Sequence, residues 1–218
     1  MVITSYGVSC FKVTSGQLVL AFDPPSKKSA AKSPYFQTDI VLISHDHDNH
    51  NGEEVLHAPK DGEIFVVDGP GEYEYKGVTI QGIASFHDNQ SGKKHGANTI
   101  YRVEIEDIAL LHMGDFGENE LRPEVKEKIG NIDIVFLPIG ADSVMDPETA
   151  AEIANQIEPK IIIPMHYNLE SEAKQKSLLK EFLDETGAHN VKPEEKLTIK
   201  KKELPEKETK IIVLEPAI

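Results

Sequence analysis

The apolar residues of this chain fall into short runs that are separated by turn-forming Gly, Pro, Asn, Asp and Ser residues. Such runs, rich in β-branched side chains, are typical of strands. Two of them, Val8–Val13 and Gln17–Phe22, flank Thr14-Ser15-Gly16 and predict a hairpin. The run Ile40–Ile43 has no polar position and predicts a fully buried strand. The other predicted strands are Ile64–Val67, Val78–Ser85, Thr99–Glu104, Ile108–His112, Asp133–Leu137, Lys160–Ile163, Lys196–Lys201 and Lys210–Leu214.

Three segments have the signals of helices instead. The pair Asp146-Pro147 supplies an N-cap and a first helical residue for a helix that extends to Glu158. The segment Glu172–Glu185 carries apolar residues at helical spacing, and Gly187 suits the end of that helix. A shorter helix is predicted at Pro123–Ile129, with Pro in its first turn.

The end of the Ile40–Ile43 run is the most unusual feature of the sequence. After Ser44, three of the chain's nine histidines, His45, His47 and His50, arrive within six residues, interleaved with Asp and Asn. Neutral imidazole is the commonest protein ligand for zinc and similar metals, and carboxylates serve beside it. A polar loop that is merely rich in histidine is the alternative, but the position after a buried strand favours a metal site.

Three later strands also end near a residue that can bind a metal, namely His87, Asp115 and His166. Each of them alone is a weak signal, because a single His after a strand is more often a hydrogen-bonded loop residue. Ligands at corresponding ends of neighbouring strands, however, meet at one edge of a sheet, where α/β proteins place their sites. Taken together, the four positions predict one metal centre at such an edge.

Composition narrows the environment and the partners. The 218 residues include 23 basic and 37 acidic ones, a formal net charge of −14, which disfavours loose binding to nucleic acid or anionic lipid. No apolar run approaches the roughly 18–20 residues that span a bilayer, and Met1–Tyr6 lacks the features of a signal peptide. The single cysteine, Cys10, favours a reducing cytoplasm. We expect one α/β domain over residues 1–218.

The segment His45-Asp46-His47-Asp48-Asn49-His50 resembles the H-x-H-x-D-H motif of the metallo-β-lactamase superfamily of metal-dependent hydrolases. The segments Gly7–Phe11 and Phe22-Asp23-Pro24 are similar to a compact branch that includes the ascorbate-phosphate lactonase-like proteins. The resemblance spans nearly the whole chain. It implies a four-layer αββα sandwich, with two sheets face to face, helices outside and up to two metals at one edge.

The ligands that the resemblance implies are His45, His47 and His87 for a first metal and His50 and His166 for a second, with Asp115 bridging the two. Bound imidazoles need acceptors that fix their tautomers. The nearest candidates for that role are Asp46, Asp48 and Asp88. For His112, a role beside the ligands and a role in packing are both open. The remaining histidines, which we expect to be exposed and uninvolved, are His57, His95 and His189.

One position departs from the motif, because Asn49 stands where the family has Asp. An amide oxygen carries no charge and is a poor zinc ligand, so the second metal site is expected to be the weaker one. The missing charge lowers occupancy, or is balanced by a carboxylate such as Asp48, or is balanced by an anionic substrate. We expect Asp115 and Asn49 to be the residues that set catalysis. The expected metal is Zn²⁺, one or two per chain, with Mn²⁺ or Fe²⁺ as alternatives.

These features predict a metal-dependent hydrolase. Zinc lowers the pKa of its bound water to about 7, so that a metal-bound hydroxide attacks an ester, lactone or phosphoester of a small soluble substrate. One alternative is a protein that binds one metal without turnover. A phosphodiesterase or nuclease is another, although the negative charge disfavours a nucleic-acid partner. No membrane partner is expected, and a homo-oligomer is left open.

Overall fold

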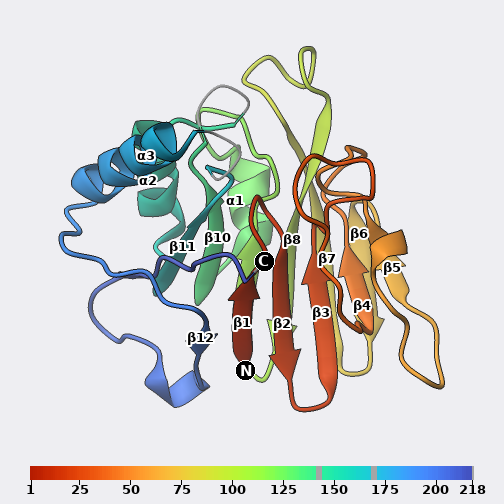
Figure 1. The fold of residues 1–218 in the computed structure, drawn as a ribbon. Helices are drawn as coiled ribbons and strands as arrows, with labels where there is room; N and C mark the ends of the chain where they lie inside the picture. Colours follow the sequence, from red (N-terminus) through yellow and green to blue (C-terminus); the bar gives the residue numbers. More distant parts are fainter. Residues whose placement is uncertain (141–143, 168–170, 218) are drawn as a thin grey trace.

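Two β-sheets packed face to face form the centre of the computed structural model, which describes residues 1–140, 144–167 and 171–217 (Figure 1). In the described residues, the first sheet has the strand order β12-β1-β2-β3-β4-β5, and the second has the order β13-β11-β10-β9-β8-β7-β6. The strands of the first sheet are β1 (Val2–Ser5), β2 (Phe11–Ser15), β3 (Leu18–Phe22), β4 (Ile40–Leu42), β5 (Phe65–Val67) and β12 (Leu197–Thr198). Those of the second are β6 (Gly71–Tyr75), β7 (Val78–Phe86), β8 (Ala97–Ile105), β9 (Ile108–His112), β10 (Ile134–Pro138), β11 (Ile161–Met165) and β13 (Lys210–Ile211).

The strand directions explain where a site can form. In the first sheet β3, β4 and β5 are parallel to one another. In the second sheet β9, β10, β11 and β13 are parallel, and β7 has the same direction because both β7 and β9 pair antiparallel with β8. The ends of β7, β9 and β11 therefore lie at the same edge of the second sheet.

The main core lies between the two sheets. Alternate residues of β2, β3 and β4, such as Phe11, Phe22 and Leu42, pack against residues of the second sheet, such as Tyr101 and Phe136. The rings of Phe11 and Phe136 have centroids 4.4 Å apart. Burial of this apolar surface is the dominant stabilising contribution to the fold.

Helices cover the outer face of the second sheet. They are α1 (Pro123–Ile129), α2 (Pro147–Ile157) and α3 (Glu172–Glu185), and Figure 1 shows α2 and α3 side by side over that sheet. A separate apolar cluster covers the outer face of the first sheet, where Phe36 and Leu56 and the short 3₁₀ helix η1 (Glu53–Val55) pack on Val41. In the described part of the chain, no helix has the length and apolar content to cross a bilayer.

The two sheets and their helices confirm the α/β sandwich that the sequence predicts. Helices α1 and α3 have the predicted bounds, and the side chain of Asp146 caps α2 by accepting a hydrogen bond of 2.8 Å from Thr149 N. The predicted strand Val8–Val13 is wrong at its start, since β2 begins only at Phe11. Gly7 and Val8 both have positive φ, which makes them part of a tight turn.

Other differences lie at short edge strands. The sequence analysis missed β1 and β6, and the predicted strand Lys196–Lys201 is strand only at β12, with the 3₁₀ helix η2 (Lys201–Glu203) at its end. The observed strand β13 is shorter than the predicted strand Lys210–Leu214, since it ends at Ile211. Short edge strands depend on their partners more than on their own apolar pattern.

A buried carboxylate connects β9, β10 and β11 at the edge of the second sheet where these strands begin. This edge is opposite to the one where β7, β9 and β11 end. Asp133, which is 5% exposed and directly precedes β10, accepts hydrogen bonds from Ala109 N on β9, from Lys160 Nζ before β11 and from Lys201 Nζ on η2. Burial by itself would raise the pKa of Asp133. The lysines and the Ala109 N–H outweigh it and hold the pKa below the usual range.

The variant Asp133→Asn is expected to lower the free energy of unfolding at pH 7 by about 2 kcal/mol, the typical contribution of hydrogen bonds to a charged group. Because the folded-state pKa is lowered, the carboxylate stabilises the protein above the unfolded pKa of about 3.9, and this contribution disappears as the pH falls through the folded-state pKa. Urea unfolding at neutral and acidic pH measures the difference. An equal difference at both pH values would contradict the role of the charge.

Candidate metal centre

The residues that the sequence analysis singled out come together at one edge of the sandwich. His45 follows β4 of the first sheet, whereas His87, Asp115 and His166 follow β7, β9 and β11 of the second. His50 completes the set from the loop that starts at His45. The site is thus built across the two sheets, from the strand ends that the topology places together.

The carboxylate of Asp115 is the centre of the cluster. Its Oδ2 atom lies 3.1 Å from His166 Nε2, 3.2 Å from His50 Nε2, 3.3 Å from His87 Nε2 and 3.8 Å from His45 Nε2. Asp115 is 3% exposed and His50 is 1% exposed. Four imidazoles from three segments of the chain therefore surround a single buried carboxylate oxygen.

The nitrogens that face this centre have no other use within the described structure. The Nε2 atoms of His45, His50 and His87 are buried and have no hydrogen-bond partner, and the ring nitrogen of His166 that points away from Asp115, Nδ1, is unpaired too. Leaving one buried polar atom unpaired costs about 1–3 kcal/mol, so several at one place need an explanation. A metal ion supplies it, because imidazole nitrogens and a carboxylate are the ligands that zinc and related ions take. The residues present fit a bound metal.

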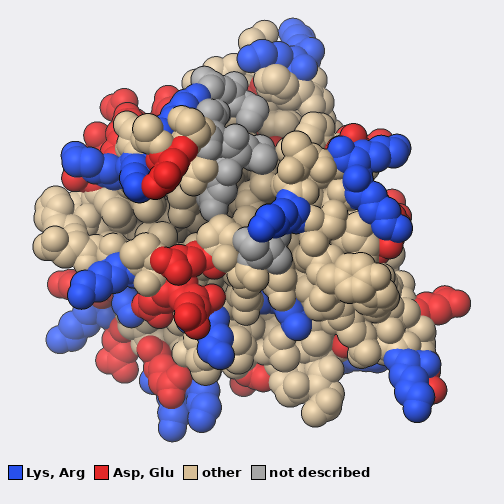
Figure 2. All heavy atoms as spheres, in the orientation of Figure 1, with Lys and Arg blue, Asp and Glu red and all other residues tan. Residues whose placement is uncertain are grey.

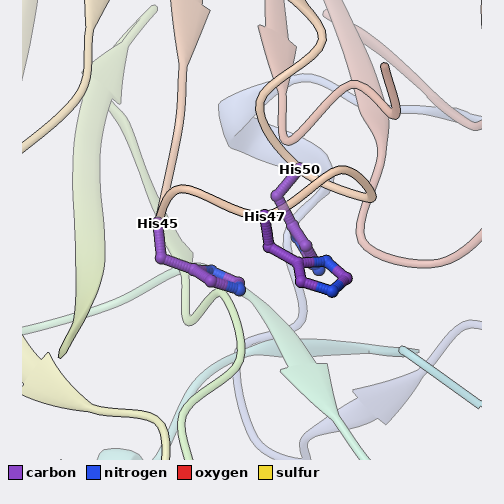
Figure 3. Close-up of side chains that lie close together, drawn as sticks. All are labelled: His45, His47 and His50. Carbon is purple, nitrogen blue, oxygen red and sulfur yellow. The ribbon is translucent and has the colours of Figure 1, made fainter. Parts of the chain in front are cut away.

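Three groups of side chains have the spacing of a ligand set, with potential ligand atoms within 4.8 Å of one another. They are His45 with His47 and His50, His45 with His87 and Asp115, and His50 with Asp115 and His166. Figure 3 shows the rings of the first group directed to the same side of their loop. Asp115 belongs to both of the deeper groups, which is the position of a bridging ligand. His47 differs from the others because it is exposed.

A second buried carboxylate, Asp23, orients two of the imidazoles. Its Oδ2 atom lies 3.1 Å from His50 Nδ1 and accepts a hydrogen bond of 2.7 Å from Ser44 Oγ. The same Ser44 Oγ lies 3.0 Å from His45 Nδ1. With a proton on Nδ1, both rings donate toward the serine and the carboxylate and turn a free Nε2 toward Asp115. This pairing of a histidine with a carboxylate fixes the tautomer that a metal needs.

The same contacts set the protonation states. Burial lowers the pKa of His45 and of His87 to about 4, so both rings are neutral at pH 7. Burial opposes a proton on His50 as well, but Asp115 and Asp23 outweigh it and raise the pKa of His50 to about 10. His166 and His50 in turn hold the pKa of Asp115 well below its usual range, against the effect of burial. A metal that binds here replaces the proton on His50.

The backbone around Asp115 needs its glycine. Gly114 has φ of +56°, and a Cβ at this position would lie 2.6 Å from the Cβ of Ser44. The residue therefore allows the β9 end to approach the Ser44 loop of the other sheet. The backbone N–H of Asp115 donates to Asn98 Oδ1 at 3.0 Å, which holds the backbone of Asp115 at this position.

The tight turn near the N-terminus contacts the side of the cluster that holds His166 and Asp115. The carbonyl oxygen of Val8 accepts from His166 N at 2.9 Å, and Ser9 Oγ lies 3.5 Å from Asp115 Oδ1. His112, fully buried, lies with Nε2 2.9 Å from the Ser9 carbonyl oxygen, and its ring stacks on Phe22 at 4.9 Å. His112 therefore packs in the core and also holds the turn that contacts two candidate ligands.

Asn49 is turned toward a neighbouring loop. Its Oδ1 atom accepts a hydrogen bond of 2.6 Å from Ser29 Oγ, and its backbone N–H lies 3.2 Å from His47 Nδ1. The amide oxygen of Asn49 thus connects the loop of residues 45–50, here called the metal loop, to the loop that follows β3. The expectation that Asn49 takes part in catalysis rests on its sequence position alone.

Asp46, Asp48 and Asp88 were predicted to accept hydrogen bonds from the candidate imidazole ligands. This prediction is wrong for Asp46 and Asp88, whose carboxylates accept other groups. Asp46 accepts from Asn51 Nδ2, and Asp88 accepts four backbone N–H groups of its own loop. Burial would raise the pKa of Asp88, but these N–H groups lower it to about 2. Asp48 is exposed. The residue that the sequence analysis missed in this role, Asp23, follows β3 directly, as the candidate ligands follow their own strands.

The expected exposed histidines are indeed at the surface. His57 and His189 are exposed and lie outside the cluster. His95 is exposed too, but its ring centroid lies 5.1 Å from that of His87, so it borders the candidate metal centre. No feature of the sequence indicates this contact, because it depends on how the loop between β7 and β8 folds back.

Comparisons with known proteins agree with this geometry. A model of the beta-lactamase superfamily domain matches residues 2–166. A relative from Thermococcus onnurineus, named a UPF0173 metal-dependent hydrolase, is 29% identical over 188 residues, covering 74% of this chain and 82% of the relative. A protein of the same name from Listeria monocytogenes is 28% identical over 198 residues, covering 77% and 86%.

Solved structures give the same result for the fold. The crystal structure of a candidate zinc-dependent hydrolase of the metallo-beta-lactamase superfamily from Thermotoga maritima superposes with a TM-score of 0.78 at 29% identity, covering 98% of this chain and 97% of that one. A metallo hydrolase from Ignicoccus hospitalis, at 21% identity and a TM-score of 0.61, covers 85% and 90% and shares the fold. From its matching domain model, its two-sheet sandwich and the solved structures that superpose on it, this chain belongs to the metallo-β-lactamase superfamily.

Proposed function

We propose that this protein is a metal-dependent hydrolase that cleaves an ester, lactone or phosphoester of a small substrate. The observation that carries the proposal is the set of four imidazoles around Asp115 Oδ2, three of which, His45, His50 and His87, direct a buried and unpaired Nε2 atom at it. The names of the Thermococcus and Listeria relatives, both metal-dependent hydrolases, support the same reaction class.

The residues proposed to hold the metal follow from the geometry and the motif. For a first ion they are His45, His47 and His87, for a second ion they are His50 and His166, and Asp115 bridges the two. Zinc is the proposed metal because imidazole-rich sites suit it, with Mn²⁺ or Fe²⁺ as alternatives. When bound, such an ion lowers the pKa of a coordinated water to about 7 and polarises a carbonyl or phosphoryl oxygen.

The protein's own side chains have separate tasks in this proposal. Asp115 supplies negative charge between the two positions, and its buried place keeps that charge close to the reacting groups. Asp23 and Ser44 hold His45 and His50 so that both Nε2 atoms face the centre. The buried, unpaired Cys10 is consistent with a reducing compartment, and we propose the cytoplasm as the location.

The test is hydrolysis of p-nitrophenyl acetate and of bis(p-nitrophenyl) phosphate before and after removal of metal by a chelator. We expect hydrolysis of at least one probe, its loss on chelation and its recovery when Zn²⁺, Mn²⁺ or Fe²⁺ is added. Metal-loaded protein that cleaves neither probe would instead support a protein that binds metal without turnover. The loop contact of Asn49 favours this second candidate, since it leaves the second metal position without a ligand from Asn49.

A further inference from the structure

A pocket of about 220 Å³ lies directly beside the candidate metal centre. His87 forms one part of its wall, and Lys94, His95, Asn119 and Thr149 contribute to the rest. The rings of His87 and His95 have centroids 5.1 Å apart. A molecule in this pocket therefore contacts a side chain of the metal centre.

A second pocket, of about 460 Å³, shares Asp88, Asn89 and Asn119 with the first. The two adjoin and form a groove that leads away from His87. The part next to the metal centre is smaller than the roughly 300–1,000 Å³ of pockets for drug-sized ligands. The groove thus suits a small molecule whose one end reaches the metal centre.

The loop that carries Lys94 is held in place by a single carboxylate. Asp88 Oδ1 accepts from the N–H groups of Gln90 and Gly92, at 2.8 and 2.9 Å, and Asp88 Oδ2 accepts from those of Lys94 and His95, at 2.9 and 2.8 Å. These four bonds fix the backbone of the loop before any ligand arrives. A binding residue on such a pre-organised backbone loses less freedom when it binds.

In the described residues, Lys94 is the one charged group of the first pocket's wall without a partner. In the second pocket Glu118 pairs with Arg122, and Glu120 is exposed. The two acidic residues of the first pocket's wall, Asp88 and Asp146, use their carboxylates to accept backbone N–H groups, Asp146 from Thr149. Lys94 is exposed and, within the described ranges, its side chain has neither an ion pair nor a hydrogen bond. Its ammonium is free to pair with a ligand.

Further lysines stand on the two loops that border the metal centre. Lys93 neighbours Lys94, and Lys27, Lys28 and Lys32 lie on the loop after β3, which contacts the metal loop through Ser29 and Asn49. Figure 2 shows basic side chains at the top of the view, over the loop between β7 and β8, and at the upper right, over the loop after β3. In a chain of net charge −14, this local excess of lysine favours the approach of small anions.

We infer that this groove binds a small substrate through a negatively charged group, a carboxylate or a phosphate, with Lys94 as its counter-charge. The bond to be cleaved then lies at the metal centre, beside His87. This inference rests on the proposed function for its reaction, whereas the anion site itself does not need turnover. Lysine binds carboxylate and phosphate groups as a compact point charge, without the fixed fork of arginine.

The test compares two esters that share a leaving group, p-nitrophenyl acetate, which is neutral, and p-nitrophenyl hemisuccinate, which carries a carboxylate. For Lys94→Ala we expect the ratio of kcat/KM for the hemisuccinate to kcat/KM for the acetate to fall about tenfold, as for loss of one charged hydrogen bond. Lys94→Arg should keep most of the ratio. The control is Lys202→Ala, an equal change of charge on exposed η2, at the far end of the sandwich. An unchanged ratio in Lys94→Ala would overturn the inference.

A binding measurement separates this inference from the proposed function. Calorimetric titration of metal-loaded protein with inorganic phosphate and with succinate gives the affinity for each anion, and we expect Lys94→Ala to weaken at least one of them about tenfold. The anion that binds the native protein more tightly, phosphate or succinate, identifies the class of anion that the site takes. If neither ester is cleaved but this loss is seen, the proposed function fails and the anion site stands. If esters are cleaved and the affinities do not change, the anion site fails alone.

Discussion

The variant Asp115→Asn is expected to lose the metal and, with it, hydrolysis. The amide has nearly the same shape, but it removes the one negative charge among the described residues that contacts His50, His87 and His166 together. Changes in residues that merely support metal ligands cost 10–100-fold in metal affinity, so the loss of a bridging ligand should cost at least about 100-fold. Zinc affinity, measured by competition with a chromogenic chelator, and the rate on the p-nitrophenyl probes report the two effects.

Asp107→Asn is the matched control for this variant. Asp107 undergoes the same chemical change in an exposed turn between β8 and β9, with φ of +60°, a conformation that Asn tolerates. Its metal affinity and rate should equal those of the native protein. A far-UV circular dichroism spectrum confirms that Asp115→Asn is folded. A folded Asp115→Asn protein with native zinc affinity would show that the imidazole cluster does not depend on this carboxylate.

The second large effect is expected for Asp23→Asn, which leaves every proposed ligand in place. Asp23 is fully buried, and its carboxylate accepts from Ser44 N, Ser44 Oγ and His50 Nδ1. An amide at this position cannot accept all of these bonds, so the rings of His45 and His50 lose their fixed direction. We expect zinc affinity to fall 10–100-fold.

The effect of Asp23→Asn on stability separates orientation from simple unfolding. Burial raises the pKa of Asp23, but the bond to His50 and the charges of the nearby histidines lower it overall, so the buried carboxylate stabilises the metal-free protein as well. We therefore expect a lower melting temperature both with and without metal, and a smaller rise on adding zinc than in the native protein. An equal rise in both proteins would contradict the orienting role.

The sequence was enough to predict which residues come together at the candidate metal centre, because most of them directly follow a strand. His45, His87, Asp115 and His166 each stand within a few residues of a buried run, and parallel directions bring those ends to one edge. The motif around His45 needed no three-dimensional information at all. Local order along the chain was therefore a reliable guide to which residues meet.

The supporting contacts could not be predicted in this way. Asp23 lies 27 positions before His50, and their contact depends on the pairing of β3 with β4 in the first sheet. Ser9 lies 106 positions before Asp115, and their contact depends on how the two sheets pack. Asp46 and Asp88 are neighbours of ligands in sequence, yet their carboxylates face their own loops. Sequence proximity finds candidate ligands that share a loop, whereas the orienting Asp23 comes from the end of a neighbouring strand and Ser9 from the other sheet.

Short edge strands are a second feature that could not be predicted from the sequence. β1 pairs with β2 and β12, and β6 pairs with β7, although neither segment has a strong apolar pattern of its own. Val8, by contrast, is apolar and lies in a turn, because the carbonyl oxygen there serves the backbone of His166. In each case a partner elsewhere in the fold decides the local structure, and that partner is invisible in the segment itself.

Elemental analysis of protein purified without chelator tests the central claim most directly. The claim is that the buried imidazoles around Asp115 exist to hold metal. We predict one or two divalent ions per chain in the native protein, and their loss in Asp115→Asn but not in Asp107→Asn. Native protein that contains no metal, and takes up none when incubated with zinc, would contradict the account.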